Sequence, residues 1–265
     1  DRQISISSID GVLSSDVTIP QITVSDTEGV WLTIDNARLN WDQGALLTGR
    51  LQINSLQADS IDYIRPAVPA EGIDLPSPEA TPLEIPELPI AIVIGELSVP
   101  SVTFGEELFG LGSEISVAGS LELIDGSLDT RLDVTRLDGP GGTLALALAY
   151  DRETENAEID LTLVEPPDGL IVNLLGMAGK PDVSLSLQGS GPLSSLRTDL
   201  GLDVGGERAL TGFAQLTRVD AGLAVAAELG GPVADLVPAA YKSFFGAETR
   251  LQTSLTIRDA GGVAV

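Results

Sequence analysis

The chain has 265 residues, of which 43% are hydrophobic and only 4% aromatic, so its apolar content is mainly aliphatic. Cysteine and histidine are both absent, which excludes disulfides, Ser-His-Asp and Cys-His catalysis, and nearly every transition-metal site. The formal net charge of −25 argues against nucleic acid, whose binding needs lysine and arginine, and against adsorption on an anionic membrane surface.

Residues 1–65 are expected to form a first block of strands. Apolar residues stand at every second position over most of the stretch from Trp31 to Pro66, which is the period of a half-buried strand. Residues 66–89 then hold seven of the 16 prolines. Because proline cannot donate to a sheet ladder, this segment is predicted to be a linker or a loop that crosses between two blocks of strands.

A second block is predicted over residues 90–181. Successive stretches place aliphatic residues on one face and Glu, Asp or Ser on the other, and short turns such as Asp125-Gly126 separate them, which is typical of an antiparallel meander. The stretch Thr143 to Tyr150 is apolar on both faces, so we expect it to be covered on both sides. Residues 168–178 have helical spacing, with Asp168 as the expected N-cap.

A third block is predicted over residues 182–265, with a turn at Gly205-Gly206 and a short helix at 232–245 that begins at Pro232. The recurrence of several strands followed by one short helix indicates a weak internal repeat. The chain starts at Asp1 and stops at Val265 in what looks like an unfinished strand, so we expect an excised fragment whose last block continues further.

The chain shows no motif that predicts chemistry. There is no phosphate-binding glycine loop and no G-x-S-x-G nucleophile elbow. Asp125, Asp129, Asp133 and Asp138 lie close in sequence but do not form a calcium loop, and most carboxylates alternate with apolar residues, as on a solvated sheet face. We therefore expect no enzymatic activity, no catalytic residue, no metal site and no cofactor.

The aliphatic face remains as the candidate for function. It is either the core between two packed sheets or the floor of an open trough that holds acyl chains, and the sequence pattern alone favours neither. If it is a trough, a bound phospholipid or fatty acyl chain is expected on its floor. The candidate lipid-groove residues are Ile115, Val117, Leu121, Leu123, Leu132, Val134, Leu144, Leu146, Leu148, Ile159, Leu161, Leu163, Val183, Leu185 and Leu187.

The first block resembles a known family. Its elements D-x-x-G-x-W-L, L-x-W, A-L-L-x-G-R-L and R-P resemble the amino-terminal part of the TamB family, the translocation and assembly module subunits of Gram-negative bacteria. Here they fall on Asp26, Gly29, Trp31 and Leu32; on Leu39 and Trp41; on residues 45–51; and on Arg65. The segments at 165–196 and 230–246 resemble the same family in order and spacing.

The resemblance implies a mostly β fold: a long antiparallel meander curled into an elongated open groove, built of strand blocks each closed by a short helix. It also implies a periplasmic fragment of a protein that is anchored in the inner membrane, related to AsmA-like and bridge-like lipid transfer proteins. Such a protein conducts phospholipid between the inner and outer membranes and supports outer-membrane biogenesis.

The partners implied by the resemblance are phospholipid, the inner membrane and an outer-membrane barrel of the Omp85 class that is similar to TamA. An alternative function is a structural or chaperone-like scaffold for the assembly of outer-membrane proteins such as autotransporters. The conduit predicts bound lipid, whereas the scaffold predicts affinity for unfolded β-strands and a dry core.

Overall fold

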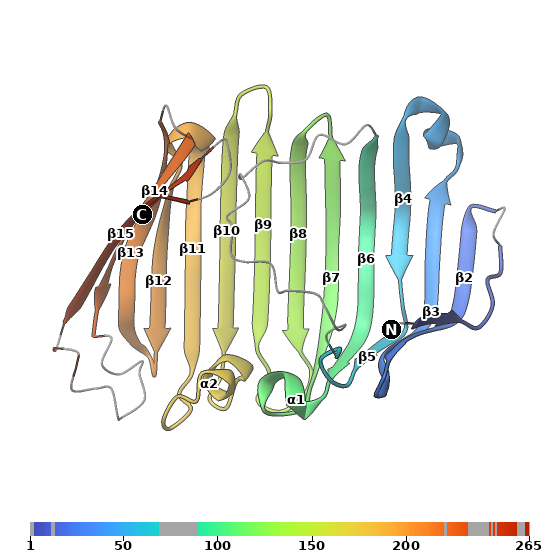
Figure 1. Ribbon diagram of the computed structural model, residues 1–265, viewed down its shortest axis with the longest axis horizontal. Coiled ribbons are helices and arrows are strands. Elements are labelled where there is room, and N and C mark those ends of the chain that lie inside the picture. Colours follow the sequence, from blue (N-terminus) through green and yellow to red (C-terminus); the bar gives the residue numbers. More distant parts are fainter. Residues whose placement is uncertain are drawn as a thin grey trace. The chain divides into compact units, whose positions relative to one another are not determined.

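The structure is a computed structural model that describes residues 3–11, 14–68, 90–219, 222–232, 244, 246, 248–258 and 263–264 (Figure 1). The chain is mostly β, with 68% strand and 8% helix, so the predicted fold class of a strand meander with a few short helices is confirmed. The described residues up to 144 form one compact unit, and those from Ala145 onward form a second. The three blocks expected from the sequence remain a prediction.

In its described residues, unit 1 is built mainly of strands, with two short helices among them. Its elements are β1 (Gln3–Ile6), β2 (Asp16–Asp26), β3 (Gly29–Asp42), η1 (Gly44–Thr48), β4 (Arg50–Gln57), β5 (Ser60–Tyr63), β6 (Ala91–Phe104), α1 (Glu106–Phe109), β7 (Ser113–Ile124) and β8 (Ser127–Arg136). They pair in the order β1-β2-β3-β4-β6-β7-β8, and β5 pairs with β3 and β6.

The pairing of β6 departs from the antiparallel meander that the sequence predicted. β6 lies parallel to β4 and to β5, while the other strand pairs among the described residues of unit 1 are antiparallel. Parallel neighbours need a crossover connection in place of a hairpin, and the proline-rich segment is the connection between β5 and β6. The predicted linker lies mostly outside the described residues, which include only 66–68 of it.

Unit 2 is an antiparallel meander from β10 onward (Figure 1). Its elements are β9 (Thr143–Asp151), β10 (Asn156–Glu165), α2 (Leu170–Leu174), β11 (Val183–Pro192), η2 (Leu193–Ser195), β12 (Arg197–Val204), β13 (Glu207–Val219), β14 (Gly222–Gly231), β15 (Thr249–Arg258) and β16 (Val263–Ala264). The first two residues of β9 belong to unit 1. The strands from β10 to β16 pair in chain order.

Two predicted turns are confirmed by their backbone angles. Asp125 and Gly126 join β7 to β8 with φ of +50° and +81°, and Gly205 and Gly206 join β12 to β13 with φ of +63° and +76°. Positive φ at both central residues is the requirement of a type I′ hairpin, whose twist matches that of the flanking strands.

The helix predicted at 168–178 is shorter than expected, and its N-cap is a different residue. α2 begins after Gly169, and Asp168 lies outside it with φ of +64°. The side chain of Glu165 caps the helix instead. Its Oε1 accepts a hydrogen bond from the backbone N–H of Leu170 at 3.0 Å, and its Oε2 accepts one from the backbone N–H of Ile171 at 2.9 Å. The helix predicted at 232–245 lies almost wholly outside the described residues.

The expectation that Thr143 to Tyr150 is covered on both sides is wrong. No residue of β9 is buried; Ala145 is exposed, and the other residues between Leu144 and Tyr150 are half-buried. The alanines that alternate along one face carry a single methyl group each, so their exposure leaves little apolar surface in water. In the described parts of the chain, no helix is both long and apolar enough to span a membrane.

Candidate functional site

An aliphatic face runs across unit 1 because the strands pair in register with their apolar residues opposite one another. One row of partners crosses six strands, and the rows beside it have the same character. That row consists of Ile6, Ile22, Ile34, Ile61, Val102 and Ile115. A second row consists of Leu51, Ile92, Leu123 and Leu128.

Six of the seven candidate groove residues of unit 1 lie on this face, and the seventh, Leu144, belongs to β9. Val117 pairs with Val99 and Val134, Leu121 pairs with Ile94, and Leu132 faces Gly119. The opposite face is polar: Asp35 accepts hydrogen bonds from Gln21 Nε2 at 2.9 Å and from Ser60 Oγ at 3.4 Å. The alternation read from the sequence therefore sorts the side chains of unit 1 onto an aliphatic and a polar face.

Unit 2 repeats this separation with its own candidates. Leu161 and Leu163 of β10 lie opposite Leu187 and Leu185 of β11, and the row of Leu163 continues through Leu202. The row of Leu161 extends to the last long strand through Leu187, Leu200, Gly212, Leu229 and Leu251. Ile159 faces Gly189. Leu144, Leu146 and Leu148 share one face of β9 and are half-buried.

The aliphatic faces are not sealed in the way that the core of a sandwich is. Leu121, Leu132, Leu161 and Leu187 are all half-buried. Among the residues that the structure describes, Val172 is the one large side chain that is fully buried. If two sheets packed face to face, most of their inward aliphatic residues would be fully buried. The half-buried leucines therefore indicate that the aliphatic faces are only partly covered.

Val183 is the exception among the candidates, since only 3% of it is exposed. It packs with Val172 of α2 and with Met177, and Leu163, Leu202 and Val204 surround this cluster. The short helix therefore covers one end of the aliphatic face of unit 2.

Four aromatic rings form a chain at one end of the aliphatic face of unit 1. The ring centroids of Trp31 and Tyr63 are 5.5 Å apart, those of Tyr63 and Phe104 are 6.3 Å apart, and those of Phe104 and Phe109 are 5.2 Å apart. These residues come from β3, β5, β6 and α1. Their separations in the sequence gave no signal that they would meet.

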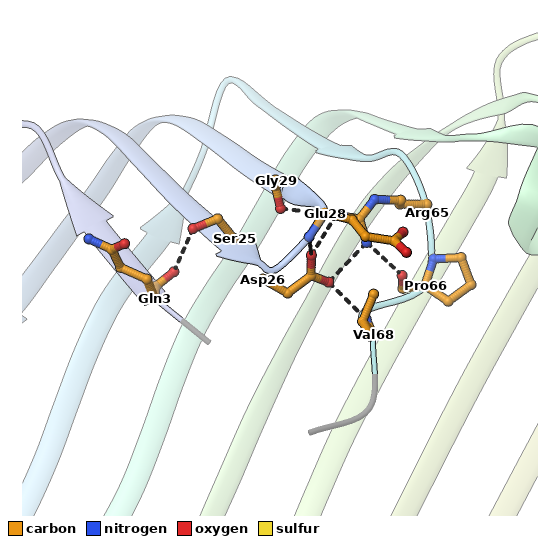
Figure 2. Close-up of polar contacts among 8 residues, drawn as sticks. All are labelled: Gln3, Ser25, Asp26, Glu28, Gly29, Arg65, Pro66 and Val68. Carbon is orange, nitrogen blue, oxygen red and sulfur yellow. Dashed lines mark hydrogen bonds and ion pairs between the residues drawn. The ribbon is translucent and has the colours of Figure 1, made fainter. Parts of the chain in front are cut away.

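Asp26 and Arg65 form an ion pair at the end of the β2–β3 hairpin (Figure 2). Arg65 Nη1 and Nη2 donate to Asp26 Oδ2 at 2.9 Å and to Oδ1 at 2.7 Å, and the backbone N–H groups of Glu28 and Val68 donate to the same carboxylate. Nη2 also donates to the carbonyl of Gly29 at 3.0 Å. The hydrogen bonds from Arg65 hold the pKa of Asp26 well below its ordinary value.

This ion pair has a structural role. It fastens the residues that follow β5 to the hairpin between β2 and β3, and only 3% of the Asp26 side chain and 14% of the Arg65 side chain are exposed. Both residues belong to the motifs that carry the family resemblance. The sequence placed them in those motifs but gave no indication that they contact each other.

Two of the aspartates considered for calcium contact neighbouring polar groups. Asp138, one of the four aspartates considered for calcium, accepts hydrogen bonds from Arg136 Nε at 3.1 Å, from Ser113 Oγ at 2.9 Å and from the backbone N–H of Glu114 at 2.8 Å. Asp129 pairs with Arg131 at 3.6 Å. Within the described ranges, no three metal-ligating side chains come together.

Comparison with protein-family models, with curated proteins and with solved structures found no match for this chain. The TamB-like motifs therefore remain a resemblance, and the functions that they imply remain expectations.

Proposed function

We propose that the chain conducts phospholipid along the aliphatic faces of its sheets. The observation that supports this proposal most directly is the rows of half-buried aliphatic residues that cross several strands in register, with polar side chains on the opposite face. A face of this kind offers continuous apolar contact to an acyl chain and does not require a catalytic group.

Movement along such a face follows from the uniformity of its contacts. Each methylene that leaves water contributes about 0.8 kcal/mol, and within a row the aliphatic side chain of one strand offers nearly the same contact as that of the next strand. Neighbouring strands are about 4.8 Å apart, so an acyl chain can shift by one strand along a row with a small net change in free energy. The lipid head group remains in water at the edge of the sheet, because burying its charge would be costly.

The setting of this activity rests on the resemblance to the TamB family. In that setting the chain is the periplasmic part of a protein held in the inner membrane, and it supplies phospholipid to the outer membrane. A TamA-like barrel of the Omp85 class is then the outer-membrane partner of the whole protein. The acidic surface suits this role, since a net charge of −25 limits adsorption of the chain on anionic membranes.

Site-specific photocrosslinking tests the proposal. A benzophenone side chain placed at Leu121 or Leu161 should capture phospholipid from vesicles. The same group at Ser120 or Asp160, which lie next to them on the polar faces, should capture at least tenfold less. Equal capture at all four positions would contradict the proposal. Capture of unfolded barrel segments but no lipid at Leu121 and Leu161 would favour the scaffold function.

A further inference from the structure

Among the described strands of unit 1, β1 is the outermost, and its open edge has an unusual composition for an acidic chain. β1 lies at the end of the strand order, and all four of its residues are exposed. Residues 3–9, with the sequence QISISSI, carry no charge. Edge strands are usually protected by charges, prolines or bulges against pairing with another chain, and β1 has neither charge nor proline.

The pairing of β1 with β2 determines which of its main-chain groups are free. The backbone N–H of Ser7 donates to the carbonyl of Gln21 in β2 at 3.0 Å, so Ser7 directs its N–H toward β2. Main-chain groups alternate in direction along a strand. Ser5 and Gln3 therefore direct their groups toward β2, and Ile4 and Ile6 direct theirs outward.

The side chains of these two isoleucines are exposed as well. Ile4 is 68% exposed and Ile6 is 47% exposed, although they belong to the aliphatic rows of Val24 and Ile22. An added strand would therefore hydrogen-bond to the same residues whose side chains end the aliphatic face. The partner that fits is an extended strand with apolar residues at alternate positions.

We propose that β1 pairs with β1 of a second copy of this chain, antiparallel and about a two-fold axis through Ser5. In this register Ile4 faces Ile6 of the second copy, and Ile6 faces its Ile4. All four outward main-chain groups of each copy then find partners, and the isoleucines of both copies lie side by side on one face. Two-fold contacts of this type are the most common among homodimers because they close.

The charge of the chain favours this edge over other surfaces. Two chains of net charge −25 repel each other, so their contact has to form where carboxylates are few. Gln3 and Ser5 provide an uncharged polar side, and the isoleucines provide an apolar one. Since only four residues of each copy pair, the structure predicts a weak dimer whose population rises with protein concentration. The inference does not depend on the proposed function.

The absence of native cysteine allows a direct test of this register. Residues on the axis of an antiparallel pair that are not hydrogen-bonded to each other have Cα atoms about 4.5 Å apart, which is within the range of a disulfide. Ser5→Cys should therefore give a disulfide-linked dimer under mild oxidation. Gln3→Cys is the matched control on the same side of the same strand, because its two copies would lie about 14 Å apart.

The expected result is at least tenfold more linked dimer for Ser5→Cys than for Gln3→Cys. Sedimentation should also show a dimer whose dissociation constant rises at least tenfold when Ile4→Lys and Ile6→Lys are combined. Equal linkage of the two cysteine variants, or no linkage in either, would overturn the proposal. A sedimentation coefficient that does not change with concentration would overturn it too.

Discussion

A charge placed on the aliphatic face distinguishes an open face from a closed core. Leu121→Arg introduces it in β7 of unit 1, where Leu121 lies between Ile94 and Thr130 in register. Leu161→Asp introduces it in β10 of unit 2, opposite Leu187. Both leucines are half-buried, so a longer or more polar side chain at either position has a short path to water.

The expected cost is small because little burial is lost. Burying a whole leucine side chain contributes about 1.5–3 kcal/mol, and a half-buried one contributes less, so we expect each variant to be destabilised by about 1–2 kcal/mol. The arginine keeps its methylene stem on the apolar surface and extends its guanidinium into solvent. In a closed core the same charge would be unpaired and would cost several kcal/mol, a large part of a typical stability of about 5–15 kcal/mol.

Urea unfolding followed by circular dichroism measures this cost, with Ser120→Arg on the polar face of β7 as the control. The variants should unfold cooperatively at a slightly lower urea concentration, and their transfer of fluorescent phospholipid between vesicles should fall at least tenfold. A loss of more than about 4 kcal/mol would mean that the face is a closed core. Normal lipid transfer by a folded variant would refute the conduit.

Three further predictions concern the contacts that hold the faces in place. Asp26→Asn should destabilise the chain at neutral pH in pH-dependent urea unfolding. The difference from the unmodified chain should fade progressively as the pH falls below 3.8, because the unfolded chain then binds a proton that the lowered pKa of Asp26 keeps off the folded chain. Glu122→Gln, which removes an exposed carboxylate, should change the stability at neutral pH by under about 0.5 kcal/mol. Gly105→Ala should lower the free energy of unfolding by at least about 1–3 kcal/mol in thermal unfolding, because the added Cβ would lie 1.8 Å from the carbonyl oxygen of Ile64. Gly112→Ala should lower it less, because its Cβ would meet its nearest atom at an ordinary contact distance of 3.6 Å. Val172→Ala should cost about 1.5–3 kcal/mol in urea unfolding, and Leu174→Ala, at a residue that is 59% exposed, should cost under 1 kcal/mol.

The sequence predicted the parts of the fold that depend on short-range patterns. Alternation of Leu121 and Glu122 along one strand decides which side chain lies on which face, and each hairpin turn decides which strands are neighbours. Gly205-Gly206 predicted its turn because few other residues adopt positive φ twice in succession. Such signals lie within a few residues of one another, so a single sequence is enough to read them.

Contacts between distant residues could not be predicted in this way. The parallel pairing of β6 with β4 depends on the path of a long connection, and the contact between Asp26 and Arg65 joins residues 39 positions apart. The capping of α2 was also missed, because Asp168 is the more usual N-cap but Glu165 reaches the free N–H groups from the end of β10. In each case the three-dimensional arrangement overrides the local preference.

Native mass spectrometry of the purified chain, combined with extraction of bound lipid, tests the central claim most directly. The account predicts that phospholipid co-purifies with the unmodified chain and is lost from Leu121→Arg and Leu161→Asp, while Ser120→Arg retains it. A lipid-free unmodified chain, or equal lipid on all of these variants, would contradict the claim that the aliphatic faces carry phospholipid.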